Sequence, residues 1–245
     1  MTDISCWESK FESCIYSDKL LNKLISLDKH GSHKINLIEV KKAIYYARKY
    51  HGNQKRQSGE PYYSHPIEVA YQIADYAFKT DVLVTSILHD TLEDTKLTKE
   101  MIGCIFGSTV ANNVEDLTRV KTDQKISAAE TMKSLYLQSK NDLLLIKIFD
   151  RLHNMQTISA KSPEKIEKIT EETLKEFIII IMSLGRIVPK ILEIEKKIIK
   201  LCYRHLFIKQ HLQQDLKMIY EDNFQLFFPN VQNGEDLKST LCLMG

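Results

Sequence analysis

Apolar residues recur every three or four positions along most of this chain, the spacing that places them on one face of an α-helix. The clearest stretches are residues 40–47, 67–74, 82–92, 143–158 and 166–183. Thr98 is a plausible N-cap of a further helix ending near Gly107, and an amphipathic helix follows Pro189. The alternation typical of β-strands is nearly absent. We therefore predict an all-α protein, a helical bundle with extra C-terminal helices.

Two polar segments interrupt the helical pattern. Residues 51–63 contain Gly52, Gly59 and Pro61 and are predicted to form a loop, and residues 121–127 form another. We expect an N-terminal helical extension over residues 1–36, a main domain over 37–188 and a C-terminal helical appendage over 189–245.

Charge and composition exclude several classes of function. The net charge of +2 gives no global field that would recruit nucleic acid or an anionic membrane. The 5 cysteines are scattered without a C-x-x-C pair, which argues against a disulfide framework and favours a reducing compartment. No signal peptide and no apolar run long enough to span a bilayer is found. We expect a cytoplasmic protein.

The candidate chemistry lies where two apolar stretches end. His89 and Asp90 follow the apolar residues 82–88, and Glu93 and Asp94 come one helical turn later. Three carboxylates and a histidine are costly to bury without a cation, so a bound metal ion would resolve the conflict. Without one, the segment would be a solvated helix end.

Two further stretches supply matching donors. Asp150 and Asn154 follow the apolar residues 143–149 in the same way, and His65 stands before Pro66 at a helix start. His65 alone would be an ordinary capping or surface residue. Two imidazoles and two carboxylates together suit one Mn²⁺, Fe²⁺ or Zn²⁺ ion with positions left for water and substrate, the centre of a hydrolase.

Five blocks in a fixed order now carry a resemblance: RQSGEPYYSHP at 56–66, HDTLEDT at 89–95, FG at 106–107, LT at 117–118 and DRLHNM at 150–155. With them the chain resembles the HD-domain hydrolases of the RelA/SpoT homologue family, in its hydrolase-only form. That family removes the 3′-pyrophosphate from the alarmone (p)ppGpp. The resemblance covers about residues 40–185.

The resemblance implies a role for each matching position. The implied ligands of a Mn²⁺ ion are His65, His89, Asp90 and Asp150. Two acids, Glu93 and Asp94, would position or deprotonate the attacking water. Arg56 is implied to pack on the guanine base, and Asn154 to contact the nucleotide. Three further residues are implied to line the same region: Tyr63, Ser64 and Arg151.

The chain also departs from the family. Gln57 stands where long members often carry a basic residue, and the segment 177–182 is more aliphatic. Alarmone synthesis is not expected, since too few residues follow for a synthetase. Two alternatives stay open: an HD-type phosphohydrolase of another nucleotide (NADPH or a deoxynucleotide), and a non-catalytic nucleotide-sensing module. The expected partner is a small guanine nucleotide and not nucleic acid or membrane, and a homodimer is left open.

Overall fold

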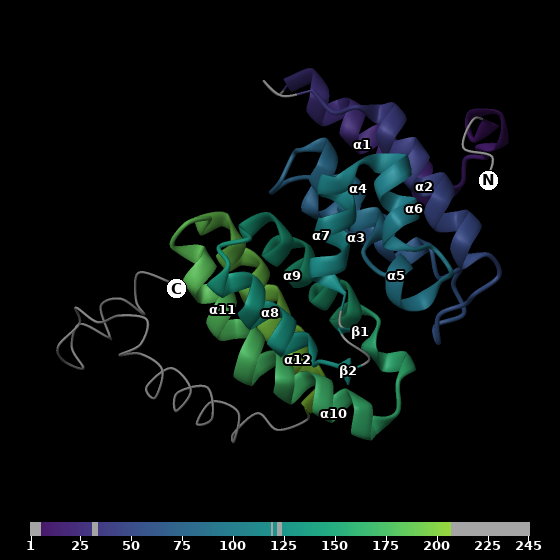
Figure 1. The fold of residues 1–245 in the computed structure, drawn as a ribbon. Coiled ribbons are helices and arrows are strands. Elements are labelled where there is room, and N and C mark those ends of the chain that lie inside the picture. Colours follow the sequence, from purple (N-terminus) through teal and green to yellow (C-terminus); the bar gives the residue numbers. More distant parts are fainter. Residues whose placement is uncertain (1–5, 31–33, 119, 122–123, 207–245) are drawn as a thin grey trace. The chain divides into compact units, whose positions relative to one another are not determined.

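The all-α prediction is confirmed by the computed structural model, which describes residues 6–30, 34–118, 120–121 and 124–206. The chain divides into two compact units, Met1–Ile166 and Glu167–Gly245. Figure 1 shows the helices of both units. The three-part division expected from the sequence stays a prediction.

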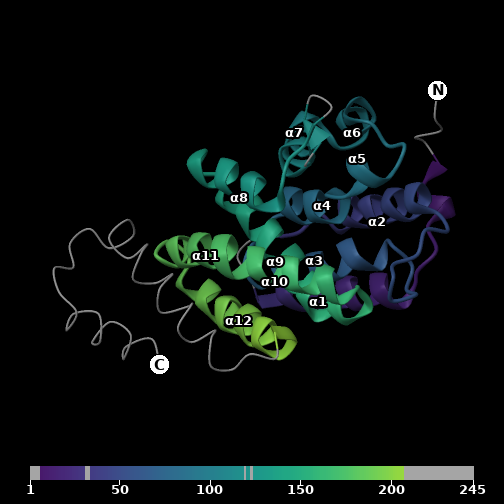
Figure 2. The ribbon, with the colours of Figure 1, turned by 90° about the horizontal axis from the view of Figure 1, so that it is seen from below.

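The first unit is built around α4 (Thr80–Leu88), where every residue from Val82 to Leu88 is buried. A helix that is apolar all round belongs in a core, and α4 packs against four other helices. These are α2 (Leu37–His51), α3 (Ser64–Ile73), α7 (Ser108–Leu117) and α9 (Asn141–Gln156). Figures 1 and 2 show α4 in the midst of this unit. The other helices that lie wholly in the described part of this unit are η2 (Glu8–Lys10), α1 (Ile15–His30), α5 (Thr91–Asp94), α6 (Lys99–Phe106), α8 (Ala128–Leu137) and η3 (Ile158–Ala160).

The helix predicted over residues 82–92 is shorter than expected. It ends at Leu88, and a single-turn helix, α5, begins at Thr91. The Thr91 hydroxyl donates to the Leu88 carbonyl at 2.6 Å, so a side chain takes up an acceptor at the end of α4. His89 and Asp90 therefore lie at the junction of two helices rather than inside one.

Local signals explain other boundaries. The predicted N-cap is confirmed, because the Thr98 hydroxyl accepts a hydrogen bond from the Met101 amide at 3.3 Å. Gly107 then ends α6 at φ +90°, a conformation that side-chain-bearing residues rarely adopt. Helices α7 and α8 were not predicted individually. The segment predicted as a loop over residues 121–127 overlaps a short antiparallel ladder that the sequence pattern did not predict. Its two strands are β1 (Val120–Lys121) and β2 (Gln124–Lys125).

The second unit begins within α10 (Pro163–Glu172). A π-helical turn, η4 (Thr173–Phe177), leads into α11 (Ile178–Gly185), and α11 packs on η5 (Pro189–Ile191) and α12 (Leu192–Leu206). The Thr173 hydroxyl donates to the Ile169 carbonyl at 2.6 Å, which accompanies the wider turn. The helix expected after Pro189 is α12, and its predicted continuation to Leu216 lies outside the described residues, as does the tail at 224–228.

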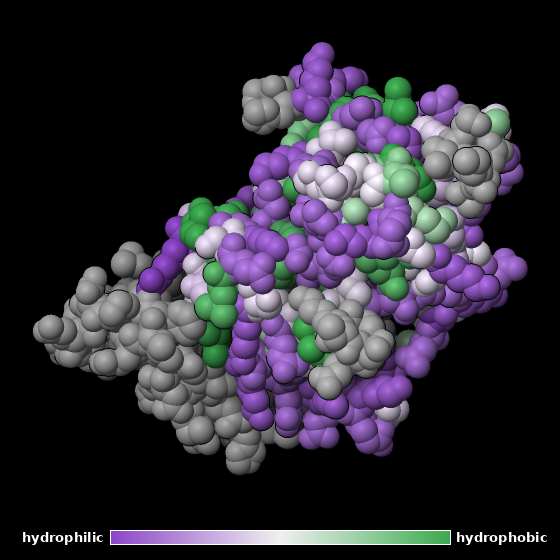
Figure 3. All heavy atoms as spheres, in the orientation of Figure 1, coloured by the Kyte–Doolittle hydropathy of each residue, from purple (hydrophilic) through white to green (hydrophobic). Residues whose placement is uncertain are grey.

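The described part of the chain has no helix with the length and apolarity needed to cross a bilayer. Cys6, Cys14, Cys104 and Cys202 are free thiols, and Cys242 lies outside the described residues. On the face drawn in Figure 3, hydrophilic residues cover most of the coloured surface and hydrophobic ones occur in small separate groups.

Candidate metal centre and active site

Three mutually packed helices position the predicted ligands. His65 is the second residue of α3, His89 and Asp90 directly follow α4, and Asp150 lies in the middle of α9. The contacts of α3 with α4, of α3 with α9 and of α4 with α9 bring these positions together. Both histidines are buried, whereas the Asp90 and Asp150 side chains keep 19% and 20% of their surface exposed. The carboxylates therefore lie at the mouth of the site and the imidazoles at its base.

The four side chains lie close together. Nε2 of His65 lies 3.1 Å from Asp150 Oδ1 and 3.6 Å from Asp90 Oδ2. Nε2 of His89 lies 3.1 Å from Asp90 Oδ1 and 3.9 Å from Asp150 Oδ1. In an octahedral shell with metal–donor bonds of about 2.1 Å, neighbouring donor atoms lie about 3.0 Å apart and opposite donor atoms about 4.2 Å apart. All four distances fall inside that interval. One donor atom each from His65, His89 and Asp150 lies within 4.8 Å of the other two, which suits a single metal ion. Asp90 is not part of that group and contacts the two histidines through its two different oxygens.

The hydrogen bonds of the two imidazoles determine which nitrogen faces the carboxylates. Nδ1 of His89 lies 2.7 Å from the Ser86 carbonyl oxygen, which only accepts, so Nδ1 carries the proton. Nε2 of His89 is buried and lies 3.1 Å from Asp90 Oδ1, but this contact does not have the geometry of a hydrogen bond. A buried ring nitrogen that faces two carboxylates in this way is the arrangement expected of a metal ligand.

The same logic applies to His65 through His153. Arg56 Nη1 and His65 Nδ1 lie 3.2 Å and 2.7 Å from Nδ1 of His153. A guanidinium only donates, so Nδ1 of His153 is an acceptor and His65 Nδ1 is the donor. Nε2 of His65 is then the nitrogen that faces the carboxylates, as in His89. Both histidines thus direct Nε2 toward the two carboxylates, where it can bind a metal ion once it carries no proton.

Electrostatics at the site reflect two carboxylates facing two imidazoles. Burial lowers the pKa of His65 below its ordinary value. Burial also acts to lower the pKa of His89, but the neighbouring Asp90 and Asp150 outweigh it and raise that pKa to about 9. The pKa values of Asp90 and Asp150 are lowered because the histidines outweigh the opposing effect of burial. The two carboxylates therefore favour positive charge beside Nε2 of His89, whether that charge is a proton or a bound metal ion.

The two predicted catalytic acids come from α5, one turn beyond the ligands. Glu93 is partly buried and Asp94 is exposed. The Tyr62 hydroxyl donates to Asp94 Oδ2 at 2.6 Å, and Gln54 Nε2 donates to the Asp94 carbonyl at 2.8 Å. Burial, together with Asp90 and Asp94, raises the pKa of Tyr62, so its hydroxyl keeps its proton and donates.

Behind these contacts, Tyr62 stacks on His51 with the ring centroids 4.7 Å apart. Gln54 Oε1 lies 2.9 Å from His51 Nδ1. The loop between α2 and α3 thus fixes the turn that carries the acids, and we call His51, Gln54 and Tyr62 the acid-anchoring cluster.

The predicted nucleotide contacts divide into two groups. Arg56 and Asn154 lie beside the ligands: Arg56 Nη2 donates to Asn154 Oδ1 at 3.1 Å, and Asn154 Nδ2 donates to Asp150 Oδ1 at 2.6 Å. Tyr63 packs edge-on against Tyr16 of α1, with the Arg48 guanidinium 5.2 Å from its ring centre.

Ser64 is buried, and its hydroxyl donates to the Pro61 carbonyl at 2.8 Å, stabilising the turn that leads into α3. Arg151 is buried on α9. A substrate contact for Tyr63, Ser64 and Arg151 stays a prediction.

Several residues of the site were not predicted. His153 and Thr157 contact Arg56, Tyr62 and Gln54 contact Asp94, and Lys147 is buried one turn before Asp150. The charge of Lys147 is among the influences that lower the pKa of Asp150 and that oppose the rise of the His89 pKa. His153 and Tyr62 lie inside the blocks noted in the sequence, so their position was a usable signal, but their partners come from other elements.

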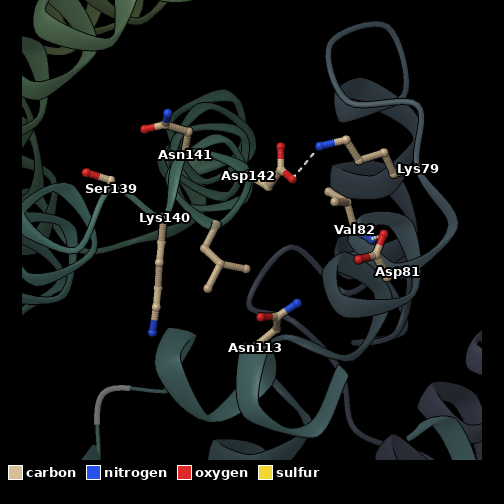
Figure 4. Close-up of a pocket in the computed structure, with 9 residues that line it drawn as sticks. Lys79, Asp81, Val82, Asn113, Ser139, Lys140, Asn141 and Asp142 are labelled. Carbon is tan, nitrogen blue, oxygen red and sulfur yellow. Dashed lines mark hydrogen bonds and ion pairs between the residues drawn. The ribbon is translucent and has the colours of Figure 1, made fainter. Parts of the chain in front are cut away.

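A pocket of about 410 Å³ lies elsewhere, at the N-terminal ends of α4 and α9. Figure 4 shows its lining, with the Lys79 ammonium paired to Asp142 at 2.7 Å. None of the residues that line it is a predicted site residue. Asp150 follows Asp142 by eight positions, so at 1.5 Å per residue the pocket lies about 12 Å along α9 from the metal-facing carboxylate.

The fold and this site together define the class of protein. A family profile described as an HD domain matches residues 43–180, more than half of the chain. The chain therefore belongs to the HD-domain family, as the sequence motifs predicted.

Among curated proteins, it is similar to a GTP pyrophosphokinase of Brucella ovis, 40% identical over 146 residues that cover 57% of this chain and 20% of that protein. It is 38% identical over 150 residues to a guanosine-3′,5′-bis(diphosphate) 3′-pyrophosphohydrolase of Aquifex aeolicus, covering 60% and 22%. It is 36% identical over 201 residues to a probable chloroplastic GTP diphosphokinase of Arabidopsis thaliana, covering 78% and 27%. The chain spans about a fifth to a quarter of the length of these relatives.

A solved structure described as a metazoan orthologue of SpoT that hydrolyses ppGpp has a TM-score of 0.49 and 20% identity. The match covers 79% of this chain and 98% of that chain.

Proposed function

We propose that this chain hydrolyses (p)ppGpp, releasing pyrophosphate from the 3′ position and leaving GDP or GTP. The observation that carries the proposal is that Nε2 of two buried histidines faces two partly exposed carboxylates. The guanidinium of Arg56 and the amide of Asn154 lie directly beside it. The relative from Aquifex aeolicus, named for this reaction, supports the choice of substrate.

We propose Mn²⁺ as the ion held by His65, His89, Asp90 and Asp150. The donors are two nitrogens and two carboxylates with no thiolate, a shell of low softness that suits Mn²⁺ and also Fe²⁺ or Zn²⁺. When bound, the ion supplies Lewis acidity to the phosphoryl group and lowers the pKa of water. Because Mn²⁺ lies low in the affinity series, chelators should remove it.

The residues around the centre have distinct tasks in this reaction. Water attacks the 3′-linked phosphorus, the bond to the ribose 3′-oxygen breaks, and that oxygen leaves with a proton. Glu93 or Asp94 takes the proton of the attacking water, a contribution of about 10²–10⁴-fold for general base catalysis. The acid-anchoring cluster holds Asp94 in place through Tyr62 and Gln54. No covalent intermediate on the protein is required.

Arg56 has a geometry that is compatible with base packing. Its contacts with His153, Asn154 and Thr157 all use guanidinium N–H groups, which lie in the plane of the group. A guanidinium stacks on an aromatic ring through its face, so its edge can keep these contacts while its face packs on guanine. Asn154, Tyr63, Ser64 and Arg151 are proposed as further contacts of the nucleotide.

The test is pyrophosphate release from ppGpp by the purified chain, with Mn²⁺ and with EDTA. Asp90→Asn removes one carboxylate charge with little change of shape, and Asp142→Asn is a matched control far along α9 from the site. We expect metal-dependent release that Asp90→Asn abolishes and Asp142→Asn retains. Phosphate release from NADPH or a deoxynucleotide without ppGpp turnover would overturn the substrate. Binding of ppGpp without turnover of any nucleotide would make the chain a sensor.

We propose that the chain acts on this small nucleotide in the cytoplasm, without nucleic acid or membrane as a partner. A homodimer also remains a hypothesis, which the molecular mass in solution would test.

A further inference from the structure

Arg56 connects to two of the metal-facing residues through two different side chains of α9. Its guanidinium reaches His153 Nδ1 at 3.2 Å, Asn154 Oδ1 at 3.1 Å and Thr157 Oγ1 at 3.3 Å. His153 in turn lies 2.7 Å from His65 Nδ1, and Asn154 lies 2.6 Å from Asp150 Oδ1. One residue of the loop between α2 and α3 therefore stands two hydrogen bonds away from a ligand on α3 and from a ligand on α9.

Donor and acceptor roles can be assigned along both chains of hydrogen bonds that start at Arg56. Since Arg56 has no acceptor, it requires an acceptor at Nδ1 of His153 and at Oδ1 of Asn154. The first requirement makes His65 donate from Nδ1 and leaves Nε2 as the nitrogen that faces the carboxylates. The second agrees with the Asp150 carboxylate, which only accepts and so takes the NH₂ group of Asn154. Without Arg56, the ring of His153 would be free to present a protonated Nδ1 to His65.

The surroundings distinguish this arrangement from a chance surface contact. His153 is buried, and the hydrogen bond between the two histidines is itself buried. Arg56 is partly buried, whereas its neighbour Lys55 is exposed. The two α9 residues that Arg56 orients are adjacent in sequence and follow the ligand Asp150 by three and four positions, which places them on its face of the helix.

We propose that His153, oriented by Arg56, is a positioning residue: it keeps the proton of His65 on Nδ1 and so leaves Nε2 available to a metal ion. We propose that Asn154, which also contacts Arg56, holds the Asp150 carboxylate in place. The proposal rests on the proposed metal centre and not on the identity of the substrate. Arg56 then has two tasks, one toward the nucleotide through its face and one toward the ligands through its edge. Residues in this second layer around a metal typically change metal affinity or activity by about 10- to 100-fold.

The experiment is a Mn²⁺ titration of the full chain, in which electron paramagnetic resonance measures the free ion. His153→Ala removes the acceptor, and His153→Asn restores one near the position of Nδ1. His205→Ala makes the same change on α12 and is the matched control. We expect His153→Ala to weaken Mn²⁺ binding about 10- to 100-fold. His153→Asn should recover most of the loss, and His205→Ala should bind like the wild type.

Arg56→Gln provides a second and independent reading, because it leaves every side chain of α9 intact. Circular dichroism without metal checks that each variant is folded, and if His153→Ala is not folded, Arg56→Gln decides. We expect Arg56→Gln to weaken Mn²⁺ binding about tenfold, at the low end of the same range. Wild-type affinity in a folded His153→Ala or Arg56→Gln would overturn the proposal, as would His153→Asn binding no better than His153→Ala.

Turnover of ppGpp is measured separately on the same variants. Loss of affinity in the expected order without any ppGpp hydrolysis by the wild type would support the positioning role while refuting the substrate. If the wild type hydrolyses ppGpp but the substitutions leave Mn²⁺ affinity unchanged, the substrate is supported and the positioning role is refuted.

Discussion

Replacing Tyr62 by phenylalanine should slow catalysis while leaving the fold intact. The change removes only the hydroxyl that donates to Asp94 Oδ2 at 2.6 Å. The ring remains and keeps its stacking on His51 at 4.7 Å. If Asp94 must be held in place to act on the attacking water, losing this bond raises the barrier to reaction.

The size of the effect follows from the bond. A hydrogen bond to a charged group contributes about 1.5–3 kcal/mol. At 1.36 kcal/mol for each factor of ten, this corresponds to a fall of about 10- to 150-fold in kcat. Asp94 is exposed, so water replaces part of the lost bond, and we expect a value near the lower end. The melting temperature should change by no more than about 2–4 °C, the shift for 1 kcal/mol in a chain of this size.

The assay is pyrophosphate release under saturating ppGpp and Mn²⁺, with Tyr71→Phe as the control. The Tyr71 ring lies against Lys19 and Lys23 rather than against the acids. A double-mutant cycle with Asp94→Ala, which removes the acceptor, then isolates the pair. The reasoning is refuted if Tyr62→Phe costs as much in the Asp94→Ala background as in the wild type, because the hydroxyl would then act through some other group.

Other expectations concern stability. Mn²⁺ at 100 times its Kd should stabilise the fold by about 2.7 kcal/mol over EDTA, a rise of about 5–11 °C in Tm that calorimetry would detect and Asp90→Asn should remove. Gly107→Ala, at φ +90°, should cost about 1–3 kcal/mol in urea unfolding, whereas Gly103→Ala, inside α6 with its nearest contact at 3.8 Å, should stabilise by up to about 1 kcal/mol. Equal effects of the two would contradict the conformational argument. Phe149→Ala, which empties a site only 1% exposed, should cost about 3–5 kcal/mol, while Leu137→Ser, at 82% exposed, should change little; near-equal urea midpoints would refute this.

The proposed ligands could be chosen from the sequence because each lies at a local transition that can be seen without the fold. His89 and Asp90 follow an apolar segment, and Asp150 follows another. The all-α class was predictable for a similar reason, since helical periodicity is a property of short windows. The ladder of β1 and β2 was not, because strands of two residues are too short for alternation to register.

The supporting residues could not be predicted in the same way. His153 stands inside a recognised block, yet its role depends on the approach of Arg56 from 97 positions away. Tyr62 lies 32 positions from Asp94, and the break of the helix at Leu88 depends on where one threonine hydroxyl points. Such contacts depend on how elements pack, which local patterns do not encode.

The site combines parts of very different depth in the fold. The proposed ligands stand on α3 and α9 and directly after α4, helices with many buried residues, whereas Glu93 and Asp94 stand on the single turn of α5. Local opening of such a turn requires less free energy than global unfolding, so its amides should exchange with deuterium before those of α4 and α9. Substitutions in α5, or in Tyr62 and Gln54, can therefore alter the position of the attacking water while the metal-facing side chains stay in place. A metal centre and an acid-bearing turn that vary independently would let one helical framework evolve toward different phosphate esters.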